Sequence, residues 1–138
     1  MNEPFTQNIE ISLYDTDMNA KISIQNIVKY FMEAAVDHSE HTEYKLDRLL
    51  AARRGWVVLN WVIKMKEYPG FADKLKISTW AKPGCSLQAT RYFTMEYEDG
   101  TTAAEAVSRW AFLDLETRHP IRCPLEMMEA YCYDREEP

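Results

Sequence analysis

Residues 23–40 read SIQNIVKYFMEAAVDHSE, and this stretch decides the fold of the chain. Its apolar side chains recur at helical spacing, which is typical of a helix that buries one face. Ser23 is a residue type that commonly caps a helix N-terminus. The predicted apolar stripe comprises Ile24, Ile27, Val28, Phe31, Ala35 and His38. We therefore expect one long helix that needs a partner surface along its length.

The sequence on both sides of this helix is typical of strands. Residues 5–13 alternate between apolar and polar side chains, and several long segments after the helix do the same. These later segments are residues 56–66, 75–82, 87–97 and 102–115, with turn signals at Pro69-Gly70, Pro83-Gly84 and Asp99-Gly100 between them. A second, shorter helix is expected over residues 45–54, ending at Gly55.

Strands that follow one another through short turns are neighbours in an antiparallel sheet, and the single apolar helix must cover one face of it. This order predicts an α+β hotdog fold, in which an antiparallel sheet curls around one long helix. A ferredoxin-like alternative requires a second long helix between the later strands, and the sequence contains no such pattern. Residues 1–138 are expected to form this single domain, with a flexible tail from about residue 130.

The composition argues against several classes of function. The chain has 138 residues and a net charge of -6, which disfavours nucleic acid as a partner because phosphates require a basic face. No apolar run approaches the ~20 residues of a membrane span, and residues 1–4 lack the pattern of a signal peptide. The cysteines Cys85, Cys123 and Cys132 suit reduced thiols better than disulfides or a zinc site. We expect a cytoplasmic protein without a metal or other cofactor.

The loop between the first strand and the long helix carries the most suggestive chemistry. It reads Leu13-Tyr14-Asp15-Thr16-Asp17-Met18-Asn19. Backbone N–H groups at a helix N-terminus stabilise a developing oxyanion, and a nearby carboxylate activates water or attacks a carbonyl. Asp and Asn are also ordinary turn formers. Taken alone, the loop leaves both readings open.

Several segments together resemble the acyl-acyl carrier protein thioesterases, in their first hotdog repeat. The matching segments, in order, are the strand before Asp15, Glu33–His38, Trp56–Trp61, Tyr68-Pro69, Ile77–Ala81, Arg91–Phe93, Asp99-Gly100, Ser108–Trp110, and Asp114 through Thr117-Arg118. The resemblance covers nearly the whole chain. It implies hydrolysis of fatty acyl thioesters, carried by acyl carrier protein or coenzyme A, in fatty acid biosynthesis or other lipid metabolism.

The segment Asp15-Thr16-Asp17 also resembles the hydroxybenzoyl-CoA thioesterase type of hotdog protein, and that resemblance makes Asp17 the catalytic carboxylate. Two-repeat members of the carrier-protein family carry an aspartate, an asparagine and a histidine in their second repeat. Here Asp17 and Asn19 match, but Lys21 stands where the histidine is expected. A single-repeat chain must supply its second half by self-association.

Four residues are candidates for catalysis. Asp17 is a general base or nucleophile, or else it caps a turn. Asn19 positions water or substrate, or else it is a turn amide. Glu33 lies off the apolar stripe; related hotdog proteins use a helix carboxylate in catalysis, and a solvated glutamate is the alternative. His38 lies on the stripe, where an active-site histidine and a packed core histidine are both open.

Five further residues are candidates for substrate binding. Trp56, Asn60 and Trp61 lie in one matching segment, where a tryptophan either lines an acyl tunnel or packs in the core. Arg53 and Arg54 belong to a local basic cluster. One reading is that the cluster binds an acidic carrier protein or the phosphates of coenzyme A. The other is that its positive charges complement the dipole at the end of a helix.

The sequence thus predicts a hotdog thioesterase that acts as a homodimer or higher homo-oligomer. One sheet curled on one helix leaves an unpaired strand edge, which proteins pair or cover. A two-fold pairing would place Asp17 of one chain near Glu33 of the other. The alternative is a non-catalytic hotdog module that binds acyl thioesters, and Lys21 in place of the family histidine favours it.

Overall fold

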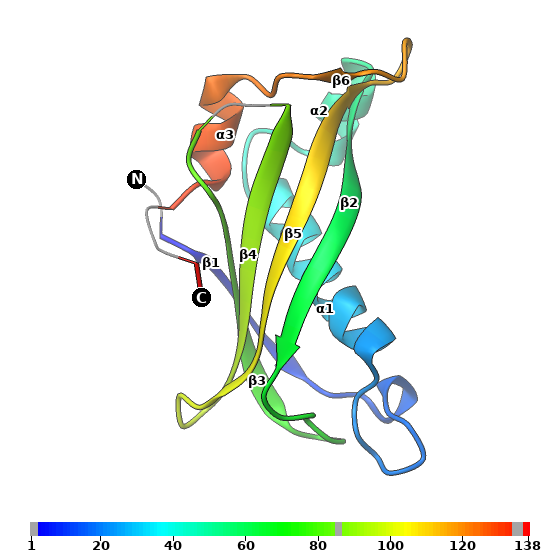
Figure 1. The fold of residues 1–138 in the computed structure, drawn as a ribbon, viewed down its shortest axis with the longest axis vertical. Helices are drawn as coiled ribbons and strands as arrows, with labels where there is room; N and C mark the ends of the chain where they lie inside the picture. Colours follow the sequence, from blue (N-terminus) through cyan, green and yellow to red (C-terminus); the bar gives the residue numbers. More distant parts are fainter. Residues whose placement is uncertain (1–2, 85–86, 134–136) are drawn as a thin grey trace.

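The computed structural model describes residues 3–84, 87–133 and 137–138, which form an antiparallel sheet with a long helix against one face (Figure 1). The strands are β1 (Phe5–Glu10), β2 (Arg54–Met65), β3 (Lys74–Ala81), β4 (Gln88–Tyr97), β5 (Thr102–Asp114) and the short β6 (Pro120–Ile121). Their order is β1-β3-β4-β5-β2, with β6 paired to β5. The long helix is α1 (Ile24–Glu40), and this arrangement is the α+β one that the sequence predicts.

Helix α1 begins where the sequence predicts. The Ser23 hydroxyl accepts a hydrogen bond from the Asn26 backbone N–H at 3.4 Å, which satisfies a donor that the first turn leaves open. The buried face consists of Ile27, Tyr30, Phe31, Ala34, Ala35 and His38. Ile24, which the predicted stripe includes, is 42% exposed. The buried face therefore contains Tyr30 and Ala34 in place of Ile24 and the half-buried Val28.

The main core lies between α1 and the sheet. Phe31 packs against Phe93, with ring centroids 4.9 Å apart, and Trp61 lies 5.2 Å from Phe93. The alternation predicted for the strands holds here, because Trp61 faces this core while its neighbours Asn60 and Val62 are exposed. A register shift between Val58 and Asn60 changes the alternation of β2, so that Trp56 before it and Trp61 after it both pack against the buried core clusters.

A second core cluster covers the other end of the sheet. It is built by two short helices, α2 (Leu46–Ala51) and α3 (Leu125–Tyr131), which close over the end of β5 and β6 (Figure 1). Tyr131 and Cys132 are buried here. The prediction of a flexible tail from about residue 130 is therefore wrong for residues 130–132. The reason is that α3 is amphipathic, and its apolar side chains complete a core that the sheet and α1 leave open.

Some predicted boundaries also shift. The first strand ends at Glu10 because residues 13–15 form a 3-10 turn. The second helix ends at Ala51 because Arg53 has a φ of 59°, the left-handed conformation that stops a helix. Gly55, the predicted stop, instead lies inside β2. Among the described residues, no helix is long and apolar enough to span a membrane.

Candidate functional site

The loop before α1 is anchored to that helix by Asp15, which is buried. Its carboxylate accepts hydrogen bonds from Lys29 Nζ at 2.8 Å and from the Tyr30 hydroxyl at 2.6 Å. The hydrogen bond from Lys29 is the main reason that the pKa of Asp15 lies below its ordinary value, and Tyr30 adds to the effect. Asp15 is thus an ionised structural carboxylate that fixes the loop to the first turns of α1.

Asp17 lies on the exposed part of the same loop. Its Oδ1 accepts hydrogen bonds from the backbone N–H groups of Asn19 (2.8 Å) and Lys21 (3.2 Å), which holds a tight turn. Within the described chain, no group donates a hydrogen bond to Oδ2. Asp17 therefore caps the turn with one oxygen and presents the other to solvent, so the two readings of this residue are compatible.

The turn is held in place by the segment after β2. Ala20 O accepts a hydrogen bond from the Phe71 N–H at 2.9 Å, and Ile22 N–H donates to Pro69 O at 2.8 Å. A methyl group on Gly70 would come 2.8 Å from Ala20 O, so the close approach requires glycine at that position. The position of Asp17 therefore depends on a distant glycine as well as on its own loop.

Glu33 is exposed on the outer flank of α1, in a shallow hollow lined by Lys29, Met32, Glu33, Val36 and Asp37. In the part of the chain that the structure describes, no hydrogen bond or ion pair joins Asp17 to Glu33. Asn19 is exposed on its loop. Asp17 and Asn19 therefore share one turn, and no hydrogen bond or ion pair between described residues links that turn to Glu33.

His38 is buried at the other end of α1. Its Nδ1 lies 3.0 Å from Arg91 Nη1, and because arginine can only donate, Nδ1 is the acceptor. Burial, followed by the charges of Arg91 and His41, lowers the pKa of His38 to about 3. The ring also stacks on Phe5, with centroids 5.2 Å apart. His38 is thus a neutral core histidine that supports Arg91.

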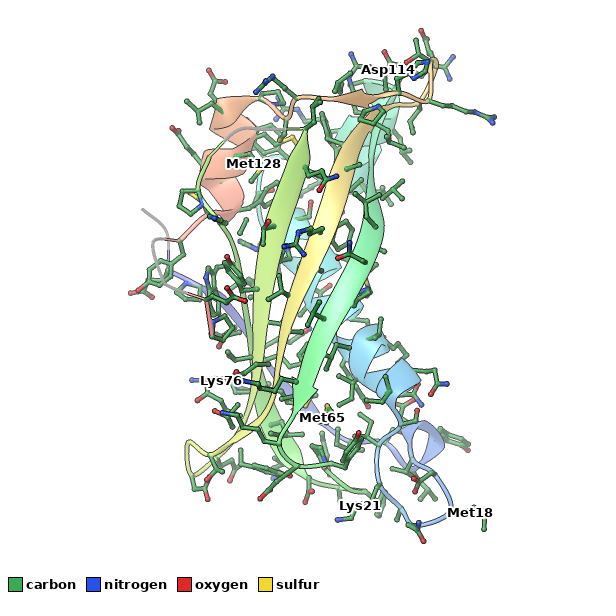
Figure 2. The ribbon with its side chains drawn as sticks, viewed as in Figure 1. Met18, Lys21, Met65, Lys76, Asp114 and Met128 are labelled. Carbon is green, nitrogen blue, oxygen red and sulfur yellow. The ribbon has the colours of Figure 1, made fainter. Side chains whose placement is uncertain are left out.

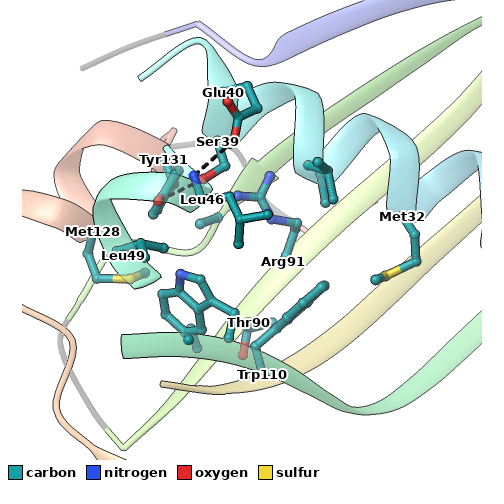
Figure 3. Close-up of a pocket in the computed structure, with 16 residues that line it drawn as sticks. Met32, Ser39, Glu40, Leu46, Leu49, Thr90, Arg91, Trp110, Met128 and Tyr131 are labelled. Atoms are coloured by element: carbon teal, nitrogen blue, oxygen red, sulfur yellow. Dashed lines mark hydrogen bonds between the residues drawn. The ribbon is translucent and has the colours of Figure 1, made fainter. Parts of the chain in front are cut away.

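A cavity of about 230 Å³ lies beside this histidine, between the C-terminal half of α1, α2, α3 and the inner face of the sheet (Figure 3). Its apolar wall includes Met32, Ala35, Leu49, Trp56, Trp110 and Met128. Its polar wall includes Ser39, Thr90, Arg91 and Tyr131. A long apolar wall with a few polar groups is typical of a site for an elongated apolar ligand.

The structure places the predicted substrate-binding residues in different environments. Trp56 lines this cavity. Trp61 packs in the main core, and Asn60 is exposed at the register shift of β2, so neither lines the cavity. Arg53 and Arg54 precede the cavity residues Gly55 and Trp56 in the chain. They form ion pairs with Glu116 at 3.3 Å and with Asp114 at 3.5 Å, respectively.

Sequence reasoning missed Arg91 and Thr90 as cavity residues. A signal for Arg91 was present, because residues 89, 93, 95 and 97 share the apolar face of one strand and Arg91 falls on the same face. A charged residue in the middle of an apolar strand face demands a buried role or a ligand. Met128 and Tyr131 of α3 gave no comparable signal, because no helix was predicted there and Tyr131 falls in the segment expected to be flexible.

The cavity and the loop with Asp17 lie at opposite ends of the molecule. Figure 2 places Met18 and Lys21, on that loop, at one end of the long axis and Met128, in the cavity wall, at the other. Among the described residues, no group of His, Cys, Asp and Glu side chains is arranged to hold a metal ion.

Comparison with known proteins decides the family. Residues 2–131 match the model of a family described as the acyl-ACP thioesterase N-terminal domain. The chain belongs to this family. One curated relative is the chloroplastic palmitoyl-acyl carrier protein thioesterase of Cuphea hookeriana, which is 24% identical over 136 residues; these are 89% of this chain and 31% of the relative. The chain thus spans about a third of the length of the curated relatives it matches.

Solved structures confirm the hotdog fold. A putative oleoyl thioesterase from Lactobacillus plantarum superposes with a TM-score of 0.89 at 19% identity, covering 94% of this chain and 50% of that one. The protein SAV2348 from Staphylococcus aureus, solved in complex with CoA, superposes with a TM-score of 0.85 at 14% identity, covering 99% of this chain and 90% of that one. The fold thus occurs both as half of a longer chain and as nearly a whole chain.

Proposed function

We propose that this protein hydrolyses fatty acyl thioesters, with water as the second substrate. The observation that carries the proposal is the cavity of about 230 Å³ with its apolar wall, which suits an acyl chain, in a chain of the acyl-ACP thioesterase family. A thioester has a good leaving group, so a positioned carboxylate and an oxyanion donor suffice for its hydrolysis. Asp17, with one oxygen open to solvent, is our candidate for that carboxylate.

Asp17 and the cavity must come from two chains for this chemistry to work. The proposed assembly is a homodimer in which Asp17 of one chain faces Glu33 and the cavity of the other. Two features support it. β2 is at one edge of the sheet, and its exposed side includes the apolar residues Val57, Leu59 and Val62. An edge strand with apolar side chains is a surface that proteins normally cover.

Arg53 and Arg54 are our candidates for docking the carrier. Both are at the end of the sheet next to the cavity, and their ion pairs with Glu116 and Asp114 are at the surface, where such pairs contribute little stability. Carrier protein and coenzyme A are both anionic partners for them. The three cysteines, odd in number and without close spacing, suit reduced thiols, and we propose the cytoplasm.

A panel of acyl thioesters of increasing chain length tests the proposal. Each acyl group is presented on coenzyme A and on acyl carrier protein, and release of the free thiol is followed with a thiol reagent. We expect turnover that depends on chain length. If every thioester stays intact although the acyl chains bind, the protein is the non-catalytic binding module, which Lys21 in the position of the family histidine favours.

Sedimentation of the same preparation tests the assembly. We expect a dimer or a higher oligomer at the concentrations at which the enzyme is active. A stable monomer with full activity would contradict both the dimer and the shared site, because one chain keeps Asp17 away from the cavity.

A further inference from the structure

We propose that the cavity binds an elongated apolar ligand whose innermost end is a carboxylate, paired with Arg91. For thioester substrates, this inference rests on the proposed function; for free ligands, it does not. Arg91 is on the inner face of β4, only 8% exposed, in the cavity wall and in line with Ala89 and Phe93.

The partners of this guanidinium group are all neutral. Nη1 donates to His38 Nδ1 and to Thr79 Oγ1, each at 3.0 Å. The group also lies over the ring of Tyr131, 5.5 Å from its centroid. Tyr131 is held in turn by a hydrogen bond with Ser39 Oγ at 3.2 Å (Figure 3). Polar and aromatic groups thus position the guanidinium without neutralising its charge.

No carboxylate of a described residue lies within ion-pair distance of Arg91. Burial lowers the pKa of Arg91 to about 10, and at neutral pH the group is still cationic. A buried charge without a counter-ion is costly, so proteins normally pair it. Arg91 therefore presents an unneutralised positive charge to an apolar cavity.

The remaining donors of Arg91 belong to a residue of the cavity wall. Of its guanidinium nitrogens, Nη1 alone has an acceptor among the described residues. The described residues also contain no buried side-chain nitrogen without a partner. Nε and Nη2 are therefore not fully buried, and together they form the paired donors that bind a carboxylate.

The cavity has an outer rim and an inner end. Val36, Glu40 and Leu46 form its exposed rim, between α1 and α2. The Glu40 carboxylate is engaged at that rim, where it accepts a hydrogen bond from the Leu46 N–H at 2.9 Å. A ligand that enters past this rim packs its apolar body on Trp56 and Trp110, and its leading end meets Arg91.

A leading carboxylate can have two sources. A free fatty acid can enter with its carboxylate first. Alternatively, the acyl chain of a thioester can carry a second carboxylate at its distal end, while the carrier stays outside. Both place the same chemical group on Arg91, and experiment can distinguish them.

Titration calorimetry on the full chain tests the shared chemistry. Medium-chain straight carboxylic acids are compared with the alcohols of the same carbon number. We expect the wild type to bind the acids at least about tenfold more tightly, a ratio that corresponds to 1.4 kcal/mol. Arg91→Met should remove this preference and keep the affinity for alcohols, whereas Arg91→Lys should keep part of it.

Arg109→Met is the matched control. Arg109 is exposed on the neighbouring strand β5, opposite Thr90 and outside the cavity, so this variant should keep the wild-type preference. Equal affinities of the wild type for acids and alcohols would overturn the proposal, as would a folded Arg91→Met that still prefers acids. The wild-type comparison decides the question even if Arg91→Met fails to fold.

Hydrolysis then separates the two sources. If the distal carboxylate is the ligand, monothioesters of dicarboxylic acids should exceed matched monocarboxylic thioesters about tenfold in kcat/KM, and Arg91→Met should remove the difference. If the free acid is the ligand, it should inhibit competitively and Arg91→Met should relieve the inhibition. Absence of all hydrolysis would contradict the proposed function alone, because calorimetry needs no turnover.

Discussion

The two ends of helix α1 present opposite kinds of chemistry. At its N-terminus, an exposed loop holds Asp17 with one carboxylate oxygen open to solvent. At its C-terminal half, a mostly apolar cavity encloses Arg91, which only neutral groups contact. One end offers a reactive group without a binding surface, and the other offers a binding surface without a reactive group. This separation is why we propose that a complete site combines the two ends from two chains.

The two ends also differ in how their charges are surrounded. At the loop end, Asp15 is paired with Lys29 at 2.8 Å, and Asp17 is exposed to water. Arg91 is shielded from water and has no ion pair among the described residues. Charges interact more strongly in a buried site than at the surface. We therefore expect substitutions at the loop end to affect rate, and those at the cavity end to affect binding and stability.

The largest effect is expected from Asp17→Asn. Loss of a general base or nucleophile commonly lowers a rate by ~10²–10⁴. An asparagine keeps an oxygen that can accept the hydrogen bonds from Asn19 and Lys21, so the thermal unfolding temperature should change little. Single-turnover hydrolysis of an acyl thioester measures the loss.

Asp99→Asn is the matched control for that variant. Asp99 Oδ1 accepts a hydrogen bond from the Thr101 N–H at 2.8 Å, so it caps an exposed turn in the same way as Asp17 but on the β4–β5 hairpin. It should retain the wild-type rate. An unchanged rate in Asp17→Asn would remove Asp17 from the mechanism and leave the loop end with a purely structural role.

Ala35→Phe tests whether the acyl chain occupies the cavity. Ala35 is buried on α1 and lines the cavity, so a phenyl ring there occupies the space of the acyl chain. We expect kcat/KM to fall about tenfold or more for long acyl chains and much less for short ones, since each methylene in an apolar pocket is worth ~1–3 kcal/mol. Leu50→Phe, at an exposed position on α2, should leave the chain-length profile unchanged. Equal losses at all lengths would place the acyl chain elsewhere.

Because His38 is buried, the free energy of unfolding should depend on pH. The pKa of this histidine is about 3 in the folded protein and 6.5 in the reference state, so below pH 6.5 the unfolded chain binds a proton that the folded chain does not. The stabilisation is therefore complete above pH 6.5 and is lost as the pH falls toward 3. The slope should approach ~1.4 kcal/mol per pH unit in this range.

Urea unfolding between the ordinary pKa of Asp15, 3.8, and pH 6.5 isolates this effect from the buried carboxylate. His38→Gln retains an acceptor for Arg91 but cannot titrate, so its stability should vary less with pH than that of the wild type. His41→Gln changes an exposed histidine on the same helix and should keep the wild-type slope. An identical slope in His38→Gln would contradict the burial argument.

The smallest effect is expected from Arg53→Gln combined with Arg54→Gln. If these residues dock an anionic carrier, KM for carrier-bound substrate should rise a few-fold, while KM for a short neutral thioester should not change. The effect should shrink with added salt, because exposed charges are screened over ~10 Å at 0.1 M. Glutamine avoids placing like charges beside Asp114 and Glu116. Equal changes for both substrates would argue against docking.

Local sequence patterns predicted most of the fold and part of the site. The Ser23 cap and the apolar period located α1, and the alternation around Trp61 assigned β2 its inner face, because both patterns depend on neighbours in the chain. The same reasoning failed at residues 130–132. A short amphipathic segment folds only if distant elements leave an apolar surface for it. That surface cannot be read from the neighbouring residues in the sequence.

Local sequence patterns were enough to predict the hotdog arrangement and the turn that carries Asp17, since hydrophobic period and turn chemistry depend on neighbours in the chain. Only the tertiary structure decided that His38 is neutral, that Arg91 faces a cavity, and that this cavity is far from Asp17. His38, Thr79 and Tyr131 are far apart in the chain, yet all three contact the buried guanidinium group of Arg91. Long-range packing brings them together, and it sets both the burial and the electrostatic interactions that give these residues their properties.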